Sequence, residues 1–102
     1  MRVTVCEMPD DRKGFEAAWQ ELTAYVSKQQ SDLVLLPELP FYPWIATTPQ
    51  FDAQVWQRAQ QAHEGMMQRL RELSASVVLG THPLIEGALR LNRGFYWTPA
   101  ND

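Results

Sequence analysis

Apolar positions recur along the chain with two different periods, and the alternation of these periods predicts the elements. Four short apolar runs are typical of strands, at residues 3–6, 33–36, 76–82 and 88–97. Between the first three runs, apolar residues recur at steps of three and four, as on one face of a helix. These helical stretches cover residues 12–30 and about 51–74. The predicted order is therefore β-α-β-α-β-β.

Strands that alternate with helices predict an α/β domain with a parallel sheet and right-handed crossovers. The run at 33–36 suits a strand that is buried on both faces. Residues 9–11 offer an N-cap for the first helix, and Thr48 with Pro49 offer one for the second. Pro83 is expected to bend or end the third strand, and Glu86 with Gly87 to form a turn into an antiparallel hairpin.

A carboxylate follows the second strand directly. Pro37 ends the regular ladder because it has no N–H to donate, and Glu38 stands next to it. The loop beyond it is stiffened by further prolines and is rich in aromatic residues, among them Tyr42 and Trp44. In open α/β sheets this carboxyl edge is where ligands bind.

The residue pattern leaves two interpretations of this loop open. Glu38 is either a loop carboxylate that accepts backbone hydrogen bonds or a general acid or base, because apolar surroundings raise the pKa of a carboxylate. Tyr42 and Trp44 either line a substrate pocket or only pack the loop.

Composition excludes several classes of protein. The 102 residues suit one domain, and the net charge of −3 comes without any run of Lys or Arg. Nucleic acids and membranes are therefore not expected as partners, and no apolar run approaches the roughly 20 residues that cross a bilayer. A signal peptide is not expected at the start of the sequence, and a single cysteine fits a reducing compartment. We expect a cytoplasmic protein.

The remaining candidate residues favour structural roles. Cys6 stands in an apolar strand and is expected to be a small buried hydrophobe. His63 and His82 lack the companions of a metal site. No phosphate-binding loop, zinc motif or serine-hydrolase motif occurs, so no metal and no cofactor is expected.

The motifs as a set resemble the N-terminal part of the nitrilase superfamily of carbon–nitrogen hydrolases. The block Asp32-Leu-Val-Leu-Leu-Pro-Glu38 is similar to that family's "D-lvvlPE" motif. The opening Arg2-Val-Thr-Val-Cys6, the run Val77-Val-Leu-Gly80 and the strand around Leu91-Asn92 resemble the family's other strands. The resemblance covers nearly the whole chain, and the block ending in Glu38 is its most specific part.

The resemblance implies an α-β-β-α sandwich that often forms homo-oligomers, and a catalytic set of Glu, Lys and Cys. Glu38 takes the position of the glutamate, the general base that activates the cysteine thiol. The thiol attacks the carbon of a small-molecule amide or nitrile, and the lysine stabilises the developing charge.

The sequence departs from the family after Glu38. The family's lysine and cysteine both come after the glutamate, whereas Lys13, Lys28 and Cys6 all precede it here. None of these three takes over a catalytic role, so the chain alone is expected to be inactive. The turn-forming end Thr98-Pro-Ala-Asn-Asp102 suggests that residues 1–102 are the front portion of a larger hydrolase domain. The alternative is a non-catalytic binding or assembly module derived from a truncated hydrolase.

Overall fold

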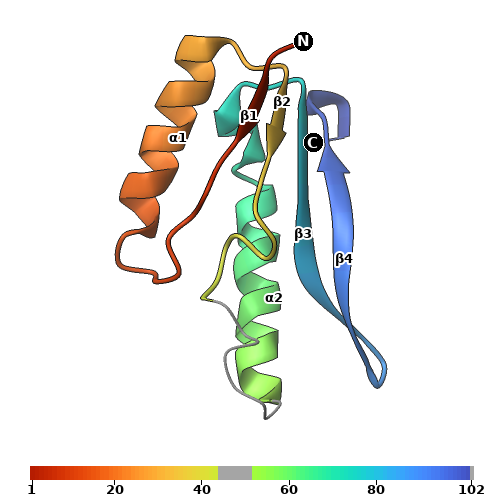
Figure 1. Ribbon diagram of the computed structural model, residues 1–102. Coiled ribbons are helices and arrows are strands. Elements are labelled where there is room, and N and C mark those ends of the chain that lie inside the picture. The colour runs from red at the N-terminus through yellow and green to blue at the C-terminus, as the bar shows by residue number, and fades with distance from the viewer. Residues whose placement is uncertain (44–51, 102) are drawn as a thin grey trace.

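A mixed four-stranded sheet forms the centre of the computed structural model, which describes residues 1–43 and 52–101 (Figure 1). Its strands are β1 (Val3–Val5), β2 (Leu33–Leu35), β3 (Val77–Glu86) and β4 (Leu89–Trp97), in the spatial order β1-β2-β3-β4. The first three strands are parallel, and β4 is antiparallel to β3. The α/β class, the parallel sheet and the closing hairpin are confirmed.

Two helices connect the parallel strands. Helix α1 (Phe15–Gln29) leads from β1 to β2, and α2 (Ala53–Met67) leads to β3. The short 3₁₀ helices η1 (Leu70–Leu73) and η2 (Pro99–Asn101) follow α2 and β4. The order of elements therefore resembles the predicted one, with the 3₁₀ helices added.

The predicted helix starts need correction. Gly14 is the N-cap of α1, and Asp11 orders the preceding turn by accepting the Gly14 N–H at 2.9 Å. Asp52 caps α2, because its Oδ1 accepts the N–H groups of Gln54 and Val55 at 2.9 and 3.2 Å. The predicted cap at residues 48 and 49 lies outside the described residues.

The second predicted helix is also shorter than its apolar pattern. It ends at Met67, and the last predicted turn forms η1, whose C-cap Ser74 has a φ of 57°. Leu70 and Leu73 are nevertheless buried, as the apolar pattern predicts, because a 3₁₀ helix also places residues that are three positions apart on the same side.

The core lies on one face of the sheet. Side chains from both helices and η1 meet inward-facing residues of the strands: Trp19, Leu22, Val26, Met66, Leu70, Leu73, Val34, Val78 and Trp97. Gly80 allows the ring of Phe95 to join them, because a Cβ at this position would lie 2.9 Å from that ring. The helices therefore cover the face that carries Val34 and Val78.

The opposite face of the sheet is apolar and open. Side chains alternate between the faces of a strand, so the register places Val5, Leu35, Leu79 and Tyr96 in one row on this face. Val5 is 71 % exposed, Leu35 41 % and Tyr96 65 %. The prediction that the strand at 33–36 is buried on both faces is therefore wrong for these described residues.

The β3–β4 hairpin projects beyond the shorter strands and runs alongside α2 (Figure 1). Strand β3 continues through Pro83 to Glu86, so Pro83 does not end the strand, which was one of the two predicted outcomes. Among the described strands, β3 has no parallel neighbour past Leu79, and a strand edge tolerates the missing N–H of proline. Gly87, with a φ of 57°, forms the turn to β4.

Candidate functional site

The loop after β2 carries Glu38 at the carboxyl edge of the parallel strands, as predicted. The last ladder contact is the hydrogen bond from the Leu36 N–H to the Leu79 carbonyl, at 2.9 Å. Pro37 comes next without a donor, and the chain leaves the sheet at Glu38. The break in the ladder therefore sets the position of the carboxylate.

The Glu38 carboxylate binds a side chain from the far edge of the sheet. Asn92 on β4 donates a hydrogen bond from Nδ2 to Glu38 Oε1 at 2.8 Å. By alternation from Trp97 and Phe95, which face the core, Asn92 lies on the open face of the sheet. Glu38 is exposed, so the apolar surroundings expected from its aromatic loop are not found among the described residues.

Two further hydrogen bonds fix the backbone on the carboxyl side of Glu38. The Leu39 N–H donates to the Thr81 hydroxyl at 2.8 Å, and the Phe41 N–H donates to His63 Nε2 at 3.2 Å. Leu39 has a φ of 45°, a left-handed conformation that a leucine rarely adopts. Contacts from β3 and α2 therefore hold a strained turn directly behind the carboxylate.

His63 has a defined tautomer and a structural role. Its Nδ1 lies 2.7 Å from the Ala59 carbonyl oxygen and its Nε2 accepts from Phe41, so the ring is neutral with the proton on Nδ1. Burial lowers the pKa of His63 to about 4, helped by the neighbouring His82 and opposed by the bond to Ala59. The expectation of a packed histidine is confirmed for this residue.

Acid is expected to loosen this loop through His63. Above the ordinary histidine pKa near 6.5 the ring is neutral in both states, but between there and about 4 only the unfolded chain binds the proton. The folded state therefore loses up to about 3 kcal/mol as the pH falls through this window. Urea midpoints at pH 7 and 4.5 should show a steeper decline for the wild type than for His63→Phe. Equal declines would contradict this assignment.

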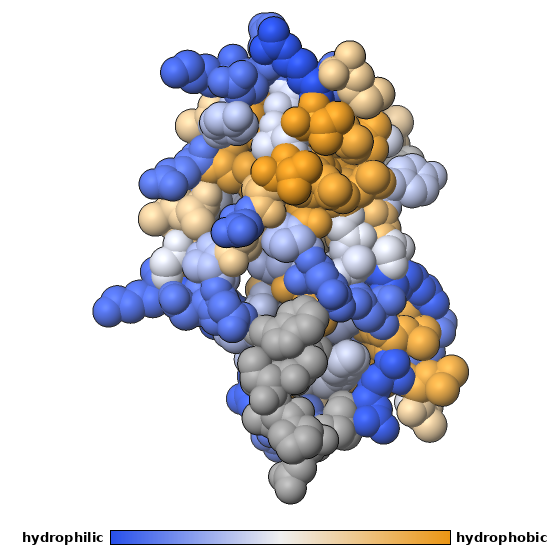
Figure 2. Space-filling view, viewed as in Figure 1, coloured by the Kyte–Doolittle hydropathy of each residue, from blue (hydrophilic) through white to orange (hydrophobic). Residues whose placement is uncertain are grey.

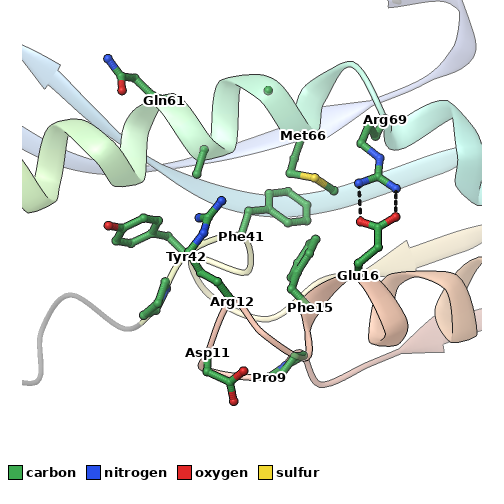
Figure 3. A pocket seen from close by; sticks show the side chains of 13 residues that line it. Pro9, Asp11, Arg12, Phe15, Glu16, Phe41, Tyr42, Gln61, Met66 and Arg69 are labelled. Carbon is green, nitrogen blue, oxygen red and sulfur yellow. Dashed lines mark hydrogen bonds and ion pairs between the residues drawn. The ribbon is translucent and has the colours of Figure 1, made fainter.

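Tyr42 lies in a different place from Glu38. It lines a hollow of about 390 Å³ between the start of α1, the aromatic loop and α2, together with Phe15, Phe41 and Met66 (Figure 3). The guanidinium of Arg12 lies over the Tyr42 ring, 5.4 Å from its centroid. Glu38 is not a lining residue of this hollow. Trp44, the other predicted substrate-binding residue, lies outside the described residues.

An ion-pair network closes one end of the hollow. Arg69 makes two hydrogen bonds of 2.8 Å to Glu16 and binds Glu72 at 3.0 Å (Figure 3 shows the pair with Glu16). Hydrogen bonds from Arg69 lower the pKa of Glu16 to about 2 and also lower that of Glu72. The single guanidinium of Arg69 bridges the two carboxylates, which makes the network a connection between α1 and the segment after α2.

The other candidate residues remain apart from Glu38. Cys6 follows β1, where it is half-buried, its Sγ lies 3.8 Å from the Leu35 carbonyl, and desolvation raises its pKa to about 11. A thiol with a raised pKa is a poor nucleophile, in keeping with the expected hydrophobic role. The ring of His82 packs on Phe95 with 5.8 Å between centroids.

Sequence reasoning missed the three partners that hold the Glu38 loop. Asn92 entered only as part of a strand, Thr81 did not enter at all, and His63 was assigned no partner. One signal was present, because Asn92 is a polar residue opposite Pro83 once the hairpin register is known. That register depends on continuing β3 through the proline.

No protein family model, curated protein or solved structure matches this chain. Within residues 1–43 and 52–101, no group of three or more His, Cys, Asp or Glu side chains is placed to hold a metal ion. The same residues contain no helix with the length and apolar character needed to cross a membrane.

Proposed function

We propose that residues 1–102 form the front portion of a carbon–nitrogen hydrolase domain, in which Glu38 is the general base. The observation that carries the proposal is the placement of Glu38 at the carboxyl edge of a parallel sheet, with one oxygen held by Asn92. The resemblance of the block ending in Glu38 to the nitrilase superfamily supplies the reaction class.

The proposed reaction hydrolyses a small-molecule amide or nitrile and needs a lysine and a cysteine from a segment after Asp102. Glu38 takes the thiol proton, and the thiolate forms a C–S bond to the substrate carbon. From an amide, the C–N bond then breaks and the proton on Glu38 leaves with ammonia. Water, deprotonated by Glu38, releases the acid and restores the thiol.

The open sheet face supports the sandwich architecture that the family would give. A row of exposed apolar side chains crosses the sheet opposite the helices, and apolar atoms gather over this part of the molecule in Figure 2. Contiguous apolar surface of this kind marks an interface, and two sheets pack face to face about 10 Å apart. We propose that a second sheet covers this face in the complete domain.

Ammonia release tests the proposed function. The complete protein, with any segment beyond Asp102, is incubated with a panel of aliphatic and aromatic amides and nitriles. We expect ammonia and the matching acid in equal amounts, and no product from residues 1–102 alone. If the complete protein releases no ammonia from any member of the panel, the proposed function is wrong.

A lysine on the open face tests the proposed second sheet. Leu35→Lys is expected to raise the soluble fraction of residues 1–102 expressed alone, because the side chain is partly exposed there. In the complete protein the same lysine would be buried without a partner, so the unfolding free energy should fall by about 3 kcal/mol or more. Ala24→Lys, on the exposed side of α1, is the matched control and should change neither quantity. Equal stability of the Leu35→Lys and Ala24→Lys proteins argues against a covered face.

A separate observation favours the second candidate, the binding or assembly module. Among the described strands, β1 and β4 each have one unpaired edge, and an open edge can accept a strand from another chain. Gel filtration of the protein as its source produces it separates the candidates. A stable complex of an 11.7 kDa chain with another protein, without hydrolysis, would favour the module.

A further inference from the structure

The bond between Glu38 and Asn92 joins segments that are 54 residues apart in the sequence. Strand β3 lies between the two segments, and its Pro83 pairs with Asn92 in the hairpin register. In the part of the chain that the structure describes, this amide is the hydrogen-bond donor to the carboxylate. The projecting hairpin therefore carries one polar side chain to the base.

We infer that Asn92 is a positioning residue for Glu38: its amide holds Oε1, so that Oε2 remains available to take the proton. This inference rests on the proposed function, because it assigns a partner to the same carboxylate. A carboxylate has no proton to donate when ionised, so the amide must present its NH₂ group. Asparagine is suited to this task because it donates without adding a charge that would compete with the lysine and the thiol.

The surrounding contacts explain why a side-chain partner is needed. Thr81 and His63 fix the backbone at Leu39 and Phe41, but neither is a hydrogen-bond partner of the carboxylate. Glu38 is exposed, so packing does not select its rotamer. Asn92 is the described contact that sets the direction of the carboxylate itself.

Kinetics of the complete protein test the inference. Asn92→Ala is expected to lower kcat by about 10- to 100-fold through misplacement of the base, with KM changed less than about twofold. Asn92→Asp has the same shape but directs a second carboxylate at Glu38, and should lose at least as much. In a Glu38→Gln background, Asn92→Ala should cause no further loss, because Asn92 acts through Glu38.

Arg93→Ala is the matched control. Arg93 is the next residue on β4, and its exposed guanidinium binds Glu86 at 3.3 Å within the hairpin. It should keep kcat within about twofold of wild type, and the unfolding midpoints of both variants should match. An Asn92→Ala enzyme with wild-type kcat, an active Asn92→Asp enzyme, or an equal loss in Arg93→Ala overturns the inference.

The outcomes also separate the two proposals. If Glu38→Gln abolishes turnover while Asn92→Ala does not reduce it, the proposed function stands and the positioning role fails. If Glu38→Gln is active, the role of the base fails, and the role of Asn92 fails with it.

Discussion

Replacement of Glu38 by glutamine is expected to lower kcat of the complete protein by about 10²- to 10⁴-fold, the usual contribution of a general base. In water, moving a proton from a thiol of ordinary pKa to a glutamate is uphill by about 5.7 kcal/mol. A positioned carboxylate near a lysine reduces this cost, and an amide cannot accept the proton at all. A 10³-fold loss corresponds to about 4 kcal/mol of transition-state stabilisation.

The geometry makes Glu38→Gln a clean test of chemistry. The amide oxygen of glutamine can still accept from Asn92 Nδ2, so the 2.8 Å contact and the turn at Leu39 should persist. The unfolding midpoint should therefore stay at the wild-type value. Glu64→Gln, an exposed change on α2, serves as the control and should keep full activity. A Glu38→Gln enzyme within a few-fold of wild type would show that another group is the base.

The sequence pattern predicted the fold where one local signal dominated. Residues such as Trp19, Leu22 and Val26 lie at helical spacing and are buried together, so the first helix followed from its period. Boundaries depended on competing contacts that the pattern does not contain. Asp11 resembles a helix cap but bonds to Gly14 before the helix begins, and Pro83 resembles a terminator but lies at an edge.

Exposure of the second strand was not predictable from its own residues. Leu33 to Leu36 are all apolar, and such a run is equally suited to a strand buried on both faces. Whether Leu35 is covered depends on what packs against the open face, not on β2 itself. The exposed fraction of 41 % therefore reflects the neighbours of β2 and not its sequence.

The position of Glu38 after the second strand was predictable from the sequence, whereas the contacts around it were not. Glu38 follows from a buried strand that ends at proline, which is a local signal. Its contact with Asn92 needs the hairpin register and the height of the loop above the sheet, neither of which is local. Tyr42 illustrates the same limit, because four residues of loop carry it to a hollow that Glu38 does not line.

Trp19→Ala is expected to have the largest effect on stability, a loss of about 3–5 kcal/mol. The ring is fully buried, stacks on Phe15 at 6.1 Å between centroids and meets the edge of Phe41 at 5.8 Å. Its indole N–H also donates to Glu72 at 3.0 Å, which ties α1 to the ion-pair network. Small domains have a free energy of unfolding of only about 5–15 kcal/mol, so this substitution removes a large part of the total stability.

The same substitution should also disturb the Glu38 loop, because Phe41 of that loop packs on Trp19 and donates its N–H to His63. Urea unfolding followed by circular dichroism measures the loss in stability. Trp19→Phe keeps a ring in the core and should lose less, while Tyr25→Ala, 53 % exposed on the same helix, should change stability little. If Trp19→Ala and Tyr25→Ala have equal midpoints, Trp19 does not anchor the core. A stability loss with unchanged turnover in the folded fraction would show that the loop is held by Thr81 and His63 without the help of Phe41.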